Sequence, residues 1–176
     1  MPRFPIASRE NVPQDQVDAF DAIVSARGGG VPEFGPVAVQ LHVPEIAQRG
    51  EVLRAYLRAD GSTLPDNVAE LAMITTAREL DCQFIWHAHA AAGRRAGLND
   101  ALVDALRDKQ ELPALSSAES AVINYGREFF RTRRVSQTTF DAALDEFGAR
   151  GLVELTNLMG YRSEEHTSEL QSHLNL

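Results

Sequence analysis

The residues with the clearest potential for chemistry lie between positions 70 and 98. This stretch begins with a glutamate and contains the only cysteine (Cys82), the only tryptophan (Trp86) and two of the five histidines (His87 and His89). Carboxylates, imidazoles and thiols are the groups that proteins use for proton transfer and nucleophilic attack near neutral pH. We therefore expect any active site to be built from this part of the chain.

The spacing of these residues indicates two consecutive helices that meet near Asp81. Cys82, Ile85 and His89 recur at intervals of three and four residues, which places them on one face of a helix with about 3.6 residues per turn. His87 is rotated by roughly 200° from His89 on the same helix. We therefore expect His89 to lie on the face that carries the Cys82 thiol, and His87 to point away from it.

Glu70 and His89 form the first candidate pair. If their helices are antiparallel neighbours, the carboxylate and the imidazole face one cavity, where one group moves a proton and the other holds the opposing charge. The alternative is structural, with Glu70 as a solvated or capping charge at a helix start and His89 as a hydrogen-bonded core histidine. The residue types alone leave both interpretations open.

Cys82 is the second candidate. In the first turn of a helix, the unpaired amide groups and the helix dipole would favour its thiolate and make it a reactive nucleophile. The alternative is a buried cysteine that acts as a small hydrophobic residue. Trp86, which lies one turn before His89, is expected to pack in the wall of the cavity.

The order and spacing of four residues resemble a family signature. Eleven residues separate Glu70 from Cys82, two separate Cys82 from Ile85, and three separate Ile85 from His89. This spacing matches the E-x11-C-x2-C-x3-H motif of the carboxymuconolactone decarboxylase and alkylhydroperoxidase D superfamily, with Ile85 in place of the second cysteine. Over roughly residues 15–161 the chain is similar to the decarboxylase-like branch.

The resemblance implies an all-α, alkylhydroperoxidase D-like helical domain that assembles as a homo-oligomer, a trimer or hexamer in its relatives. The leading function is a cofactor-free, decarboxylase-like carboxy-lyase that acts on a small carboxylated lactone or a related ring acid from aromatic catabolism. Glu70 and His89 would then handle protons, and Cys82 would be a third catalytic candidate that lines the pocket. Ile85 and Trp86 would form the wall of the substrate pocket.

Two other functions stay open. A peroxiredoxin-like alkyl hydroperoxide reductase would use Cys82, but in the peroxidase branch the second cysteine of the motif attacks the peroxide, and Ile85 removes that group. Only a one-cysteine reaction, resolved by an external thiol, would remain. The other alternative is a non-catalytic helical oligomer that binds a small molecule.

Composition and charge argue against several other classes of protein. The chain has 176 residues, a formal net charge of −8 and a pI near 5.1. It has no basic stretch long enough to follow nucleic-acid phosphates, and no apolar run long enough for export or for a membrane span. The single cysteine fits a reducing cytoplasm. We expect no metal and no cofactor, because neither a Cys/His ligand cluster nor a glycine-rich phosphate loop after a strand is present.

The hydrophobic periodicity predicts helices throughout the chain, and no strand pattern competes. Local signals set the boundaries, with Asn99 as an N-cap, a capping box at Ser116 and Glu119, and Gly148 as a helix end. The expected helices cover about residues 11–27, 44–59, 65–81, 82–97, 99–109, 116–133 and 136–148, with one more from 152 onward.

Residues 162–176 differ in kind from the rest of the chain. Their sequence, RSEEHTSELQSHLNL, is polar and lacks an apolar stripe. We expect this segment to be a non-native tail attached to a C-terminally truncated single helical domain of residues 1–161, and we exclude it from the functional assignment.

Overall fold

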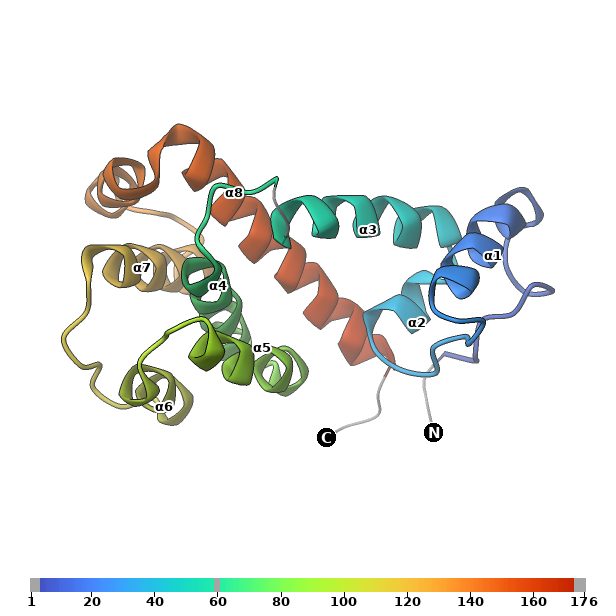
Figure 1. The fold of residues 1–176 in the computed structure, drawn as a ribbon, viewed down its shortest axis with the longest axis horizontal. Helices are drawn as coiled ribbons and strands as arrows, with labels where there is room; N and C mark the ends of the chain where they lie inside the picture. Colours follow the sequence, from blue (N-terminus) through green and yellow to red (C-terminus); the bar gives the residue numbers. More distant parts are fainter. Residues whose placement is uncertain (1–3, 59–60, 173–176) are drawn as a thin grey trace. The chain divides into compact units, whose positions relative to one another are not determined.

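The chain is all-α over the residues that its computed structural model describes, 4–58 and 61–172, the side chains of residues 165, 166 and 168–172 excepted. Over this part of the chain there are eight α-helices, one short 3-10 helix and no strand (Figure 1). The predicted fold class is therefore confirmed. Within the same residues, no helix combines the length and the apolar content that crossing a membrane requires.

The chain divides into two compact units. One unit comprises Met1–Tyr56 with Glu164–Leu176, and the other comprises Leu57–Ser163. The division at residue 161 into a single domain and a non-native tail stays a prediction.

The first unit has a small apolar core at its N-terminal helices. Its elements are η1 (Gln14–Gln16), α1 (Val17–Ala26), α2 (Pro36–Gln40) and most of α3 (Pro44–Arg58). Phe20 of α1 and Leu41, which follows α2, are almost fully buried and pack with Ala7, Val12 and Val17.

The second unit is organised around α4 (Asp66–Glu79). This helix packs most extensively against α5 (Gln83–Arg95) and α7 (Ser117–Arg131), with α6 (Asp100–Asp108) and part of α8 (Gln137–Ser172) completing the unit (Figure 1). Leu71, Ala72 and Ile74 of α4 are fully inaccessible to solvent. A helix that is buried on most of its faces is a central element of the core, so α4 gives Glu70 a rigid support.

Local sequence signals set several helix boundaries as predicted, but α1 begins at Val17, after the 3-10 helix η1, and the short helix α2 was not expected. The side chain of Asn99 accepts a hydrogen bond from the first turn of α6, and Ser116 and Glu119 form the expected capping box of α7. Asp81, between α4 and α5, has a left-handed φ of 52°. The predicted break at Gly148 is present as a kink in α8, where this glycine has a φ of 66°.

Gly126 of α7 lies where that helix comes close to α4 and α8. A Cβ atom added at Gly126 would lie 2.8 Å from Cγ2 of Thr75 and 3.1 Å from Cε of Met159. Both neighbours are buried, and the β-branched Thr75 has little rotamer freedom on a helix. We expect Gly126→Ala to lower the free energy of unfolding by about 1–3 kcal/mol, because overpacking outweighs the better helix propensity of alanine.

Gly160 of α8 provides the matched control for this substitution. It is an exposed helical glycine, and an added Cβ would meet nothing within 4 Å. Gly160→Ala is expected to raise the free energy of unfolding by up to about 1 kcal/mol. Urea denaturation of both variants measures the difference, and equal stability would contradict the close packing of α7 against α4.

Candidate functional site

Glu70 and His89 meet where α4 packs against α5. His89 Nδ1 lies 2.9 Å from Glu70 Oε2. Because an ionised carboxylate only accepts hydrogen bonds, Nδ1 carries the proton and donates it. Both residues are buried, with exposed fractions of 5% for His89 and 8% for Glu70. The structure therefore brings together the two residues that the sequence analysis pairs, and their catalytic role stays a prediction.

Gly93, one turn after His89, lies at the contact between α5 and α4. A Cβ added at Gly93 would lie 3.6 Å from the Cβ of Glu70 and 2.8 Å from Cδ1 of Leu98. The contact with Glu70 would be an ordinary van der Waals contact, whereas the side chain of Leu98 would have to move. Gly93 thus lies directly against Glu70 where α5 packs on α4.

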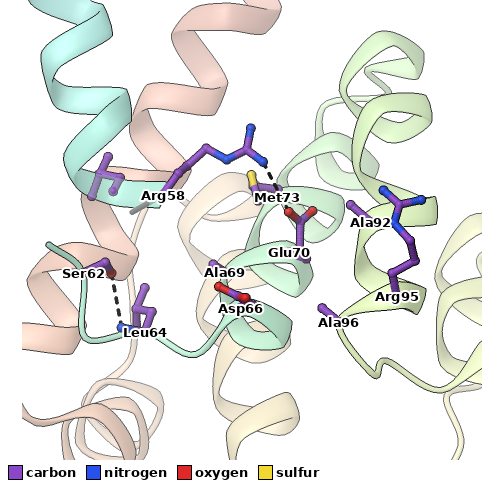
Figure 2. Close-up of a pocket in the computed structure, with 11 residues that line it drawn as sticks. Arg58, Ser62, Leu64, Asp66, Ala69, Glu70, Met73, Ala92, Arg95 and Ala96 are labelled. Carbon is purple, nitrogen blue, oxygen red and sulfur yellow. Dashed lines mark hydrogen bonds and ion pairs between the residues drawn. The ribbon is translucent and has the colours of Figure 1, made fainter. Parts of the chain in front are cut away.

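Glu70 borders a cavity of about 370 Å³ (Figure 2). Arg58 directs its guanidinium at the carboxylate, with Nη2 3.6 Å from Glu70 Oε1, so one carboxylate oxygen faces a cation and the other accepts from His89. Arg95, the last residue of α5, also lines the cavity. His89 is not among the lining residues that the structure describes, and its contact with Glu70 links it to the cavity. Further lining comes from Leu57, Ser62, Leu64, Asp66, Ala69, Met73 and Ala92.

The loop before α4 is held in place by Glu154, a buried residue of α8. Glu154 Oε2 accepts hydrogen bonds from the backbone N–H of Thr63 at 2.7 Å, from its hydroxyl at 2.7 Å and from the Ser62 hydroxyl at 3.1 Å. Glu154 Oε1 accepts from Nε of Arg150 at 2.9 Å. Sequence reasoning missed this residue, although a carboxylate between Leu152 and Leu155 of an apolar stripe is the kind of signal that marks a buried acceptor.

Cys82 borders a different cavity from Glu70. This second cavity has a volume of about 530 Å³ and is also lined by Arg78, Trp86, His87 and Arg107. Cys82 is 2% exposed and is the N-cap of α5, with extended backbone angles of −87° and 97°. The sequence analysis predicts that Cys82 shares a helix face with His89 and that His87 points away from it. This prediction is wrong, because Cys82 and His87 line this cavity together and His89 is not among its described lining residues. The reason is that Cys82 precedes the helix, so helical rotation does not apply to it.

Ile85 and Trp86 also lie away from Glu70. Ile85 is 1% exposed and packs with Ala77 and Cys82 in a small buried cluster, and the partly buried Trp86 packs against this cluster. Trp86 lines the cavity beside Cys82, and neither residue is among the described lining of the cavity beside Glu70. Their predicted place in the wall of the Glu70 pocket is therefore corrected.

The two arginines at the end of α5 have different surroundings. Arg94 donates from Nε to Asp100 at 2.8 Å and from Nη2 to Asp104 at 2.7 Å, which ties α5 to α6. Arg95 instead borders the cavity that contains Glu70. Of these two arginines, Arg95 is thus the one that lines the Glu70 cavity. Among the side chains that the structure describes, no group of three or more metal-binding residues is found.

Comparison with known proteins identifies a family that matches part of the chain. Residues 44–128 match the model of the carboxymuconolactone decarboxylase family, and this range contains Glu70, Cys82, Ile85 and His89. The region of residues 44–128 belongs to the carboxymuconolactone decarboxylase family. Comparison of this family member with curated proteins found no match.

A solved structure shows the same fold as this carboxymuconolactone decarboxylase family member. It is the crystal structure of an alkylhydroperoxidase AhpD core, an uncharacterized peroxidase-related protein from Ralstonia eutropha JMP134. The two structures align with a TM-score of 0.67 and 14% sequence identity, over 94% of this chain and 87% of the other. At this identity the similarity establishes the alkylhydroperoxidase D-like fold and leaves the reaction to be argued from the site.

Proposed function

We propose that this family member is a cofactor-free carboxy-lyase that acts on a small carboxylated lactone or a related ring acid. One observation supports the proposal above others: a carboxylate held by a buried histidine, Glu70 with His89, borders a cavity that also presents Arg58 and Arg95. Such a cavity combines a group that transfers protons with cations that attract an anionic substrate.

In this proposal Glu70 is the catalytic residue and His89 is its positioning residue. Loss of CO2 breaks a carbon–carbon bond and leaves the electron pair on the substrate, where conjugation with the lactone carbonyl spreads the charge. Glu70, ionised at rest, takes up a proton from water before this step and transfers it to this carbon, and the hydroxide that the water leaves combines with the released CO2 as bicarbonate. The Nδ1–H of His89 stabilises the carboxylate that Glu70 becomes in this step and fixes its orientation.

The arginines bind the acid groups of the substrate in this proposal. Arg95 is exposed and borders the cavity, so its guanidinium is accessible to a carboxylate. Arg58, whose side chain is 37% exposed, lies 3.6 Å from Glu70. A guanidinium binds a carboxylate through two parallel hydrogen bonds, which orients the substrate as well as attracting it.

The alternative function, a one-cysteine hydroperoxide reductase, receives less support from the geometry. It would place the reaction at Cys82, which borders the other cavity and is 2% exposed. Ile85 fills the position of the second motif cysteine, so the resolving thiol would have to come from outside the chain.

Turnover of carboxylated lactones by the wild-type protein and by Cys82→Ser tests the proposal. We expect CO2 release from at least one small carboxylated lactone, with kcat/KM of the variant within about twofold of wild type, because Cys82 lies outside the cavity with Glu70. A protein that consumes peroxide, loses that activity in Cys82→Ser and turns over no lactone would overturn the proposal in favour of the reductase.

Arg95→Gln is expected to raise KM for the carboxylated substrate by about 10–100-fold, because the variant loses a charge-assisted contact in the cavity. Arg94→Gln is the matched control, since its guanidinium is already bonded to Asp100 and Asp104. The KM of Arg94→Gln should stay near the wild-type value even if the melting temperature of this variant falls. Steady-state kinetics of both variants measure the effect, and equal KM values would argue against substrate binding by Arg95.

A further inference from the structure

We propose that the cavity beside Cys82 is a second ligand site, which binds a small aromatic carboxylate independently of the cavity that contains Glu70. Its volume of about 530 Å³ suits a small molecule, and its lining comes from α4, the turn at Asp81, α5 and α6. The proposed function does not use this cavity, and the inference does not depend on it.

The walls of this cavity favour a flat apolar group. Trp86 presents an indole ring, and Ala77 and Cys82 contribute further apolar surface. An aromatic ring packs well against an indole, in a stacked or an edge-to-face arrangement. The aromatic part of the ligand therefore lies against Trp86.

Arg78 supplies the anchor for the carboxylate. Its Nε is buried and has no hydrogen-bond partner, although the residue lines the cavity. Its Nη1 donates to Asp81 at 3.2 Å, a contact that leaves the Nε edge of the guanidinium without an acceptor. A buried donor without a partner is unfavourable. In the proposed complex the Arg78 side chain, which is 24% exposed, turns this edge toward the cavity, so that a carboxylate supplies the missing acceptor in the geometry that guanidinium groups prefer.

The remaining charges around the cavity are already balanced. Arg107 bonds Asp108 with Nε at 2.8 Å and Asp104 with Nη1 at 3.1 Å, and the bond to Arg107 holds the pKa of Asp108 below its usual range. Asp81 is mostly exposed and shared between Arg78 and Lys109. Arg78 is thus the cation around this cavity that has a buried donor still to satisfy.

Tryptophan fluorescence reports on this site directly, because Trp86 is the only tryptophan in the chain. Benzoate is the probe, and benzamide is the neutral control of nearly the same shape. We expect a saturable change in Trp86 emission with benzoate, and at least tenfold weaker binding of benzamide. Absence of a saturable change up to about 10 mM benzoate, or equal binding of the two probes, would overturn the proposal.

Two variants locate the binding. Arg78→Lys keeps a cation opposite Asp81 but loses the Nε donor, so it is expected to weaken benzoate binding at least tenfold. Arg58→Gln alters the cavity with Glu70 and is expected to leave the benzoate response unchanged. The reverse result, with binding lost in Arg58→Gln and kept in Arg78→Lys, would place benzoate in the other cavity and overturn the proposal. Since the comparison of benzoate with benzamide uses the wild-type protein, the test does not depend on the folding of a variant.

Discussion

Replacing Glu70 by glutamine is expected to lower kcat/KM for a carboxylated lactone by about 10²–10⁴-fold, the usual contribution of a general acid or base. The amide has nearly the same size, and its oxygen still accepts the hydrogen bond from Nδ1 of His89. The variant should therefore keep the fold and the cavity while losing the group that transfers the proton.

Asp66→Asn is the matched control for Glu70→Gln. Asp66 lines the same cavity, is exposed, and lies in the first turn of the same helix. We expect a change in kcat/KM of less than about tenfold, because this residue has no assigned part in the proton transfer. Steady-state kinetics of both variants, with circular dichroism to check folding, measure the difference. Equal losses of kcat/KM in the two variants would show that the charge of the cavity matters and that Glu70 has no special role in proton transfer.

Glu154→Ala is expected to lower the free energy of unfolding by about 3–5 kcal/mol, the range found when one partner of a buried charged network is removed. Glu154 is 4% exposed and accepts hydrogen bonds from Ser62, Thr63 and Arg150. Its loss leaves the backbone N–H of Thr63 without this acceptor and releases the loop that lines the Glu70 cavity. A rise in KM should therefore accompany the loss of stability.

Glu146→Ala on the same helix is the control for that effect. Glu146 is exposed, so its replacement is expected to change the free energy of unfolding by no more than about 0.5 kcal/mol. Chemical denaturation of the two variants measures the difference between their free energies of unfolding. Similar stabilities would mean that the network around Glu154 contributes little to holding the loop.

The helices themselves were predictable because their signals are local. A capping box at Ser116 and Glu119 involves residues three apart, and the cap at Asn99 and the kink at Gly148 likewise depend on neighbouring residues. Hydrophobic periodicity reports which face of each helix is buried without specifying its partner. The all-α class and most helix boundaries therefore followed from short stretches of sequence.

The candidate site was predictable only in part. The spacing of Glu70 and His89 places them on consecutive helices, and the antiparallel packing of α4 and α5 brings them to 2.9 Å. The same reasoning failed for Cys82, because a residue just before a helix does not follow the helical rotation that places its neighbours.

The sequence by itself determined the helical class and the positions of most helix ends, and it named Glu70 and His89 as a candidate pair. Only the tertiary structure decided that Cys82 and Glu70 border separate cavities, that Arg95 rather than Arg94 meets the Glu70 cavity, and that Glu154 holds the loop beside it. The physical reason is the separation along the chain of the residues that interact. Helix periodicity and capping arise within a few residues, whereas a cavity or a buried carboxylate network forms between segments that lie far apart along the chain and meet only when the helices pack.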